Sequence, residues 1–108
     1  MPERLTKEVF TRQLKTKFRV LPQTEGAPVV ELELDEVVPF PTLPHSRSDV
    51  ERFSAFFYGP ADHFLPQMTY RMEHGQLGEL DVFLVPVASD QRGLRYEAVY
   101  SYFTDDEG

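Results

Sequence analysis

The chain of 108 residues contains no cysteine, no tryptophan and no long run of apolar residues. Without cysteine it has no disulfide bond, no thiolate metal ligand and no cysteine nucleophile. A domain that folds without such cross-links is typical of a reducing compartment. The opening Met-Pro-Glu-Arg-Leu lacks the apolar core of a signal peptide, and no segment is apolar over the length that a membrane-spanning helix needs. We therefore expect a soluble, cytoplasmic protein without a membrane partner.

Basic charge is scarce outside the N-terminal end. The net charge is −7, yet residues 1–19 hold six basic side chains against two acidic ones, a balance of +4. The remaining residues hold five basic and sixteen acidic side chains, a balance of −11. Such an acidic body lacks the basic surface that binds phosphates, so we expect no nucleic-acid partner. We interpret the basic end as a solvated helix face on the acidic sheet, in preference to a docking surface for an acidic subunit.

The chain does contain alternating apolar and polar residues, the pattern of half-buried β-strands. Val30, Leu32 and Leu34 alternate with acidic residues, and the alternation then slips at Glu36. A β-bulge near Asp35 would restore the phase. We favour the simpler interpretation, in which the strand ends there and leaves Glu36 at the rim.

Residues 53–103 carry the strongest pattern, in which apolar residues fall at every other position in four blocks closed by Gly or Pro. Four such blocks in succession predict an antiparallel meander. Pro86 cannot donate a ladder hydrogen bond, so we expect its end of the strand at an edge or a bulge.

Two other segments depart from this pattern. Residues 6–14 have the features of a short helix, because Thr6 can cap the first turn and Phe10 and Leu14 share one face. So short a helix must pack on the sheet to be stable. Residues 39–49 include three prolines within six positions, which indicates an irregular loop.

These patterns predict one domain over residues 1–108, composed of a basic helix segment (1–16), the Pro-rich loop (39–49) and the meander (53–103). The fold class is mainly β. About six antiparallel strands form a small barrel or compact sandwich, and the short N-terminal helix packs over one end or face.

Several runs of sequence resemble a known family. They are Leu-Thr-Lys-Glu-Val-Phe (5–10), Phe-Ser-Ala-Phe-Phe-Tyr-Gly-Pro (53–60), Leu-Pro-Gln-Met-Thr-Tyr-Arg-Met-Glu-His (65–74), Leu-Gly-Glu-Leu-Asp-Val-Phe-Leu-Val-Pro-Val (77–87) and Tyr-Glu-Ala-Val-Tyr (96–100). Over nearly the whole chain, these runs resemble DUF6916, a small bacterial domain family of unknown function. The shared motifs, such as Gly-Pro and Leu-Pro, mark turns and strand ends and have no known catalytic role. The resemblance therefore implies an intact domain and no site residues.

No catalytic motif is recognisable in the sequence. The only histidines, His45, His63 and His74, lack the spacing of metal ligands. Ser54 lacks the sharp turn that exposes a nucleophile, and there is no Gly-rich phosphate loop. We therefore predict no catalytic residue, no metal site and no cofactor, and favour a non-enzymatic protein.

Two segments, 53–58 and 80–87, have apolar side chains on both faces of the expected sheet. The second face must be covered by the helix, by barrel closure or by another subunit. This favours a structural or protein-interaction module within a larger assembly, with a protein partner or self-association as a homo-oligomer. The candidate interface residues lie on the second face and in the loop region: Phe56, Tyr58, Phe83, Val85, Phe40 and Leu43.

The alternative is a small-ligand-binding β-barrel, or an enzyme without a familiar motif, that uses the barrel mouth near Glu36, His63 and His74. An apolar pocket with convergent polar groups would favour this alternative. A filled core beside an exposed apolar patch would favour the interaction module.

Overall fold

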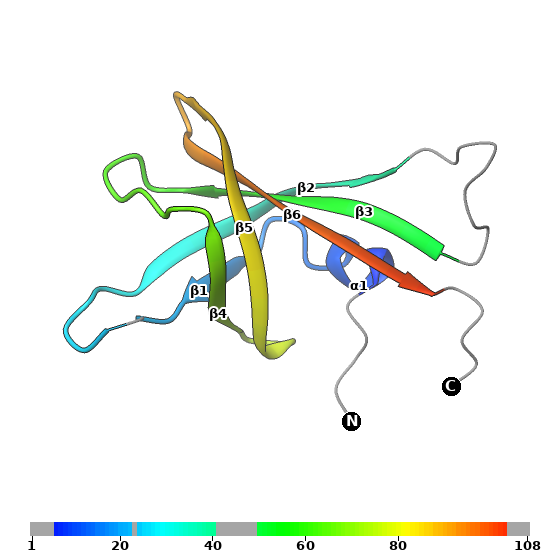
Figure 1. The fold of residues 1–108 in the computed structure, drawn as a ribbon, viewed down its shortest axis with the longest axis horizontal. Helices are drawn as coiled ribbons and strands as arrows, with labels where there is room; N and C mark the ends of the chain where they lie inside the picture. The colour runs from blue at the N-terminus through cyan, green and yellow to red at the C-terminus, as the bar shows by residue number, and fades with distance from the viewer. Residues whose placement is uncertain (1–5, 23, 41–49, 104–108) are drawn as a thin grey trace.

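The computed structural model describes residues 6–22, 24–40 and 50–103 of the chain. The described residues form a closed barrel of six antiparallel strands and one short helix (Figure 1). In chain order the elements are α1 (Lys7–Thr11), β1 (Lys17–Val20), β2 (Val30–Pro39), β3 (Val50–Gly59), β4 (Met68–His74), β5 (Gly78–Asp90) and β6 (Gly93–Phe103). The mainly β prediction is confirmed, and the architecture is the barrel.

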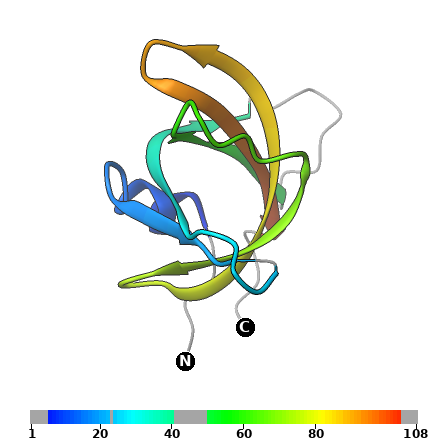
Figure 2. The same cartoon turned by 90° about the vertical axis from the view of Figure 1, so that its left-hand side faces the viewer.

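The strand order around the barrel is β1-β2-β3-β6-β5-β4, and pairing of β1 with β4 closes it (Figure 2). The predicted meander is therefore correct for β4, β5 and β6 but wrong for β3, which pairs with β2 and β6. Residues 60–67 separate β3 from β4, too long a connection for a tight hairpin. With β3 beside β6 over ten register pairs, the last four strands have a Greek-key order.

β2 does not end at Glu36 as the favoured interpretation held. It continues to Pro39, and its register with β3 shifts between Leu34 and Glu36. The extra residue, Asp35, makes a β-bulge that returns Val37 to the core side. A second register shift lies between Pro86 and Ala88 in β5, as expected from the missing N–H of Pro86.

The inward side chains fill the barrel with aromatic and aliphatic groups. The largest fully buried ones are Tyr70, Tyr96, Phe10, Phe18, Phe53, Phe57, Leu32, Leu34, Met72, Leu84 and Val82. In β2, β4 and β5 these residues alternate with more exposed ones, which is the pattern the sequence shows, whereas in β3 Ser54 is buried as well. Closure of the sheet thus buries most of the inner face.

The helix packs against one end of this core. Thr6 caps it by accepting a hydrogen bond from Val9 N–H at 3.3 Å. The ring of Phe10 lies 5.6 Å from that of Phe53 and 5.0 Å from that of Tyr100, between centroids. The helix ends at Thr11, earlier than predicted, because the chain turns over residues 12–15 to enter β1.

Three strands continue beyond the closed part of the barrel. β5 pairs with β6 only from Val85–Glu97 to Asp90–Gly93, and its first half pairs with β4 instead. Figure 1 shows β5 and β6 diverging from this point. We call residues 37–39, 50–55 and 98–103 the three-stranded extension, in which β3 lies between β2 and β6, and the rest of the barrel the closed half. One face of the extension packs on α1.

Candidate functional site

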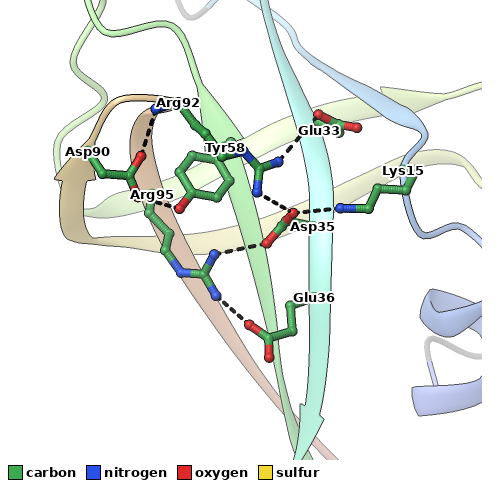
Figure 3. A network of polar contacts seen from close by, with 8 residues as sticks. All are labelled: Lys15, Glu33, Asp35, Glu36, Tyr58, Asp90, Arg92 and Arg95. Carbon is green, nitrogen blue, oxygen red and sulfur yellow. Dashed lines mark hydrogen bonds and ion pairs between the residues drawn. The ribbon is translucent and has the colours of Figure 1, made fainter.

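A network of charged side chains covers part of the outer surface of the barrel (Figure 3). At its centre the carboxylate of Asp35 contacts Lys15 Nζ at 2.7 Å, Arg92 Nη1 at 2.9 Å and Arg95 Nη1 at 3.0 Å. The Asp35 side chain is only 11% exposed. The hydrogen bond from Lys15, with those from Arg95 and Arg92, lowers the pKa of Asp35 to about 2 despite its desolvation. Asp35 is therefore ionised across the physiological range.

The bulge and an unusual turn bring these groups together. Lys15 has a left-handed backbone conformation with φ of 69°, which residues other than glycine rarely adopt. Its N–H donates to the carbonyl of Leu34 at 2.7 Å, the residue before the bulge. The turn after α1 and the bulge in β2 thus fix each other, and the Lys15 ammonium reaches Asp35.

The two arginines also cover aromatic rings on the outer face. The guanidinium carbon of Arg92 lies 4.1 Å from the ring centroid of Tyr58, and that of Arg95 lies 4.4 Å from the centroid of Phe56. Arg95 also donates to Glu36 at 2.6 Å. Cations over aromatic faces are attracted by the ring quadrupole. In this half of the molecule, the chain's own arginines therefore partly cover the second apolar face.

A solvent-open cleft of about 510 Å³ lies beside the network. Its walls come from the β1–β2 region, from the segment after β3 and from Arg92. The lining residues are Lys17, Pro28, Val29, Val30, Glu31, Glu33, Tyr58, Gly59, Pro60, Asp62, His63 and Arg92. The polar residues that line the cleft are mostly charged, with both signs present. Only a few of the lining side chains are apolar.

His74, at the end of β4, is a buried structural residue. Its Nδ1 accepts the N–H groups of Gln76 at 3.0 Å and Leu77 at 3.2 Å, so the proton of the neutral ring is on Nε2, which lies 2.9 Å from Thr16 Oγ1. Burial, followed by the nearby charge of Arg19, lowers the pKa of His74. Both ring nitrogens are therefore occupied by contacts that hold the chain together.

The three residues of the alternative ligand site lie in different surroundings. His63 lines the cleft, Glu36 binds Arg95, and His74 is buried behind β1 residues such as Phe18, whose ring centroid lies 4.3 Å away. Within the described residues, no group of three or more histidine and acidic side chains is placed to hold a metal ion. His45 lies outside the described residues.

The interface candidates divide into two groups. Phe83 on β5 and Phe40 after β2 are exposed, at 49% and 43%. Phe56, Tyr58 and Val85 are half-buried, the first two beneath the arginines. Leu43 lies outside the described residues.

The exposed apolar residues outside the candidate interface set include Val38 and Val99. They lie in one register row of the extension, on either side of Ser54, whose hydroxyl donates to Glu97 at 2.6 Å. Val38 faces outward only because the bulge shifts the phase of β2, so placing the bulge from the sequence would have found it. We call Val38, Phe40 and Val99 the outer apolar patch.

The fold and surface define a small antiparallel barrel with a filled core, a charged network on its closed half and an apolar patch on its extension. The chain belongs to the family described as domain of unknown function DUF6916, whose model matches residues 5–100. This confirms the resemblance found in the sequence. The chain matches no curated protein and no solved structure. In the described part of the chain, the helix is too short to cross a membrane.

Proposed function

We propose that this domain is a non-enzymatic structural or protein-interaction module that binds a protein partner, or a second copy of itself, within a larger assembly. The observation that carries this proposal is the outer apolar patch. Val38, Phe40 and Val99 are between 37% and 54% exposed; Val38 and Val99 share one face of the extension, and Phe40 directly follows β2. Clustered apolar side chains on a small domain are typical of protein interfaces.

The barrel's remaining features support a binding role over catalysis. The inward side chains pack the core, and His74 and Glu36 are engaged in structural contacts. A cytoplasmic location in a bacterial cell is part of the proposal, and the cysteine-free composition fits it.

The test is affinity capture from the native host, with quantitative mass spectrometry, using a patch variant that combines Val38→Thr, Phe40→Ser and Val99→Thr. Phe64→Ser is the matched control, because Phe64 is also exposed but lies in the connection between β3 and β4. We expect a specific partner to be retained by the wild type and the control and reduced at least tenfold with the patch variant. Equal recovery of the same partners by the patch variant would contradict the proposal.

The ligand-binding alternative keeps one observation in its favour, the cleft that contains His63. Its open, oppositely charged walls differ from the enclosed apolar lining typical of small-molecule sites. Nuclear magnetic resonance shifts that cluster at Glu31, His63 and Arg92 on addition of one compound class would favour this alternative over the module.

A further inference from the structure

β6 has an open edge beyond the point where β5 leaves it. On one side, the strand pairs with β3 along its whole length, from Gly59–Leu94 to Val50–Phe103. On the other side, β6 pairs with β5 only over residues 93–97, so the pairing ends at Glu97. Among the described residues, none makes a ladder with residues 98–103 on that side, and Figure 1 shows this half of β6 running clear of β5.

The backbone groups on this edge can be assigned. Phe40 N–H donates to the carbonyl of Arg52, so the even-numbered residues in this part of β3 direct their backbone groups to β2. The odd-numbered residues of β3 then bond to β6, where their register partners are even-numbered. Val99 and Ser101 therefore direct their N–H and C=O groups toward the open side.

This edge lacks the features that protect a strand from pairing. Such protection is provided by charged side chains, proline or a bulge. The corresponding open edge of β5 carries Glu79 and Asp81, and that of β2 carries Glu36 and ends at Pro39. Residues 98–103, Ala-Val-Tyr-Ser-Tyr-Phe, contain no charge and no proline, and their register with β3 is regular. The β6 edge is thus open to a further strand.

A buried hydroxyl beside this edge also lacks a partner. The ring of Tyr100 packs against Phe10 and Phe53, and among the described residues its buried hydroxyl has no hydrogen-bond partner. Burial first, and the charge of Asp81 on β5 second, raise its pKa. An unsatisfied buried donor is rare and costs stability, which a neighbouring strand could recover.

We propose that the open edge of β6, residues 98–103, pairs antiparallel with the same edge of a second copy, joining two extensions into one continuous sheet. Val99 bonds with Ser101 of the second copy, so Tyr100 lies opposite its own equivalent. The same surface serves both copies, as a twofold dimer requires. This inference rests on the proposed function, because it names the partner of the extension.

The absence of charge at this edge permits a second copy to approach there. Two chains that each carry a net charge of −7 repel one another over most of their surface. Residues 98–103 form an uncharged stretch where that repulsion is weakest. Val99, exposed to 54%, would lie beside its counterpart on the outer face, so the pairing also buries part of the outer apolar patch.

Sedimentation equilibrium of the wild type tests the proposal, with Val99→Pro as the blocking variant. Proline removes the edge N–H and leaves the hydrogen bonds to β3 in place. We expect a wild-type dimer and a dissociation constant raised at least a hundredfold in Val99→Pro. Ser101→Lys adds a charge to the same edge and should weaken the dimer without any proline strain. Phe64→Ser, which changes an exposed apolar residue in the connection between β3 and β4, should remain a dimer.

Disulfide trapping checks the register, because the natural chain has no cysteine. Mixed Val99→Cys and Ser101→Cys chains should form a cross-linked heterodimer on mild oxidation. A wild-type protein that stays monomeric at about 1 mM would overturn the second-copy proposal, while patch-dependent capture of another protein would still support the interaction module. If the wild type is monomeric and the captured protein no longer binds Val99→Pro, the second-copy proposal is likewise overturned. The edge of β6 would then pair with a strand of that other protein.

Discussion

The closed half of the barrel and the three-stranded extension both contain strands with apolar side chains on two faces. The second apolar face is covered differently in the two halves. In the closed half, the guanidinium groups of Arg92 and Arg95 lie over Tyr58 and Phe56. In the extension, α1 covers one face, and the other leaves Val99 54% exposed. A strand with apolar side chains on both faces therefore indicates that both faces will be covered. Its sequence does not indicate whether arginine side chains, a helix or another chain covers the second face.

The two halves also differ at their strand edges. Closure pairs β1 with β4, and the open edge of β5 carries Glu79 and Asp81, whereas the extension ends in an uncharged edge on β6. A barrel removes the edges through which sheets aggregate. We infer that the closed half provides stability and the extension provides the binding surface. This division predicts that damage to the closed half lowers stability, while changes in the extension alter association.

The largest expected effect is that of Gly93→Ala, in the closed half. Gly93 has φ of +133°, and a Cβ there would clash with the carbonyl oxygen of Gly59. Because backbone must move and the conformation is strained, we expect a loss of about 3 kcal/mol or more in the free energy of unfolding. Urea unfolding followed by circular dichroism measures this loss.

Gly75→Ala is the matched control, because a Cβ there meets no atom within 4 Å. We expect a change of about 0.5 kcal/mol or less. Similar losses for the two variants would show that close packing of β3 against the β5–β6 turn does not hold the barrel closed.

The second prediction concerns the charged network. Asp35→Asn leaves Lys15, Arg92 and Arg95 around a neutral side chain, so we expect a loss of about 2 kcal/mol at pH 7. The wild type should also lose this contribution on acidification, because the pKa of Asp35 is about 2 in the folded state against an ordinary value of 3.8. A folded pKa below the unfolded one gives stability that is present above about pH 4 and lost toward pH 2.

Glu33→Gln is the control for this network, since Glu33 lies 3.9 Å from Arg92 and contacts it only weakly. We expect a change of about 0.5 kcal/mol or less. Acid unfolding should be unchanged in the control and lack the Asp35 contribution in Asp35→Asn. If Asp35→Asn were as stable as the control, the arginines would not depend on Asp35 to cover the aromatic rings.

The strands themselves could be predicted from the sequence, because burial of one face imposes a period of two on Val30, Leu32 and Leu34 and on their counterparts in other strands. The order in which the strands lie side by side in the barrel could not be predicted from the sequence. Alternation is the same whichever strand lies alongside, and the position of β3 beside β6 follows from pairing across distant sequence. The sequence therefore identifies the barrel class but not its order.

The site was harder to predict for a related reason. The slip at Asp35 was visible, and its cause was a bulge, but the three cations that meet there come from the turn after α1 and from the β5–β6 region. Their convergence depends on the barrel order. Phe56 and Tyr58 were identified as needing a cover, whereas arginines remote in sequence supply it. Charged side chains beside apolar strands are too common to indicate such contacts.

The smallest expected effect is a pH dependence due to His74. Burial lowers its pKa in the folded state, so the unfolded chain takes up the proton first as the pH falls. Stability is therefore complete above the unfolded pKa of about 6.5 and decreases below it, by less than the Asp35→Asn loss. Urea unfolding at pH 7 and pH 5 should show this decrease in the wild type and in His63→Gln, whose histidine lines the open cleft. In His74→Gln the decrease should disappear. Because this window lies well above that of Asp35, a single titration can separate the buried contact that fixes the end of β4 from the charged network on the outside of the same barrel.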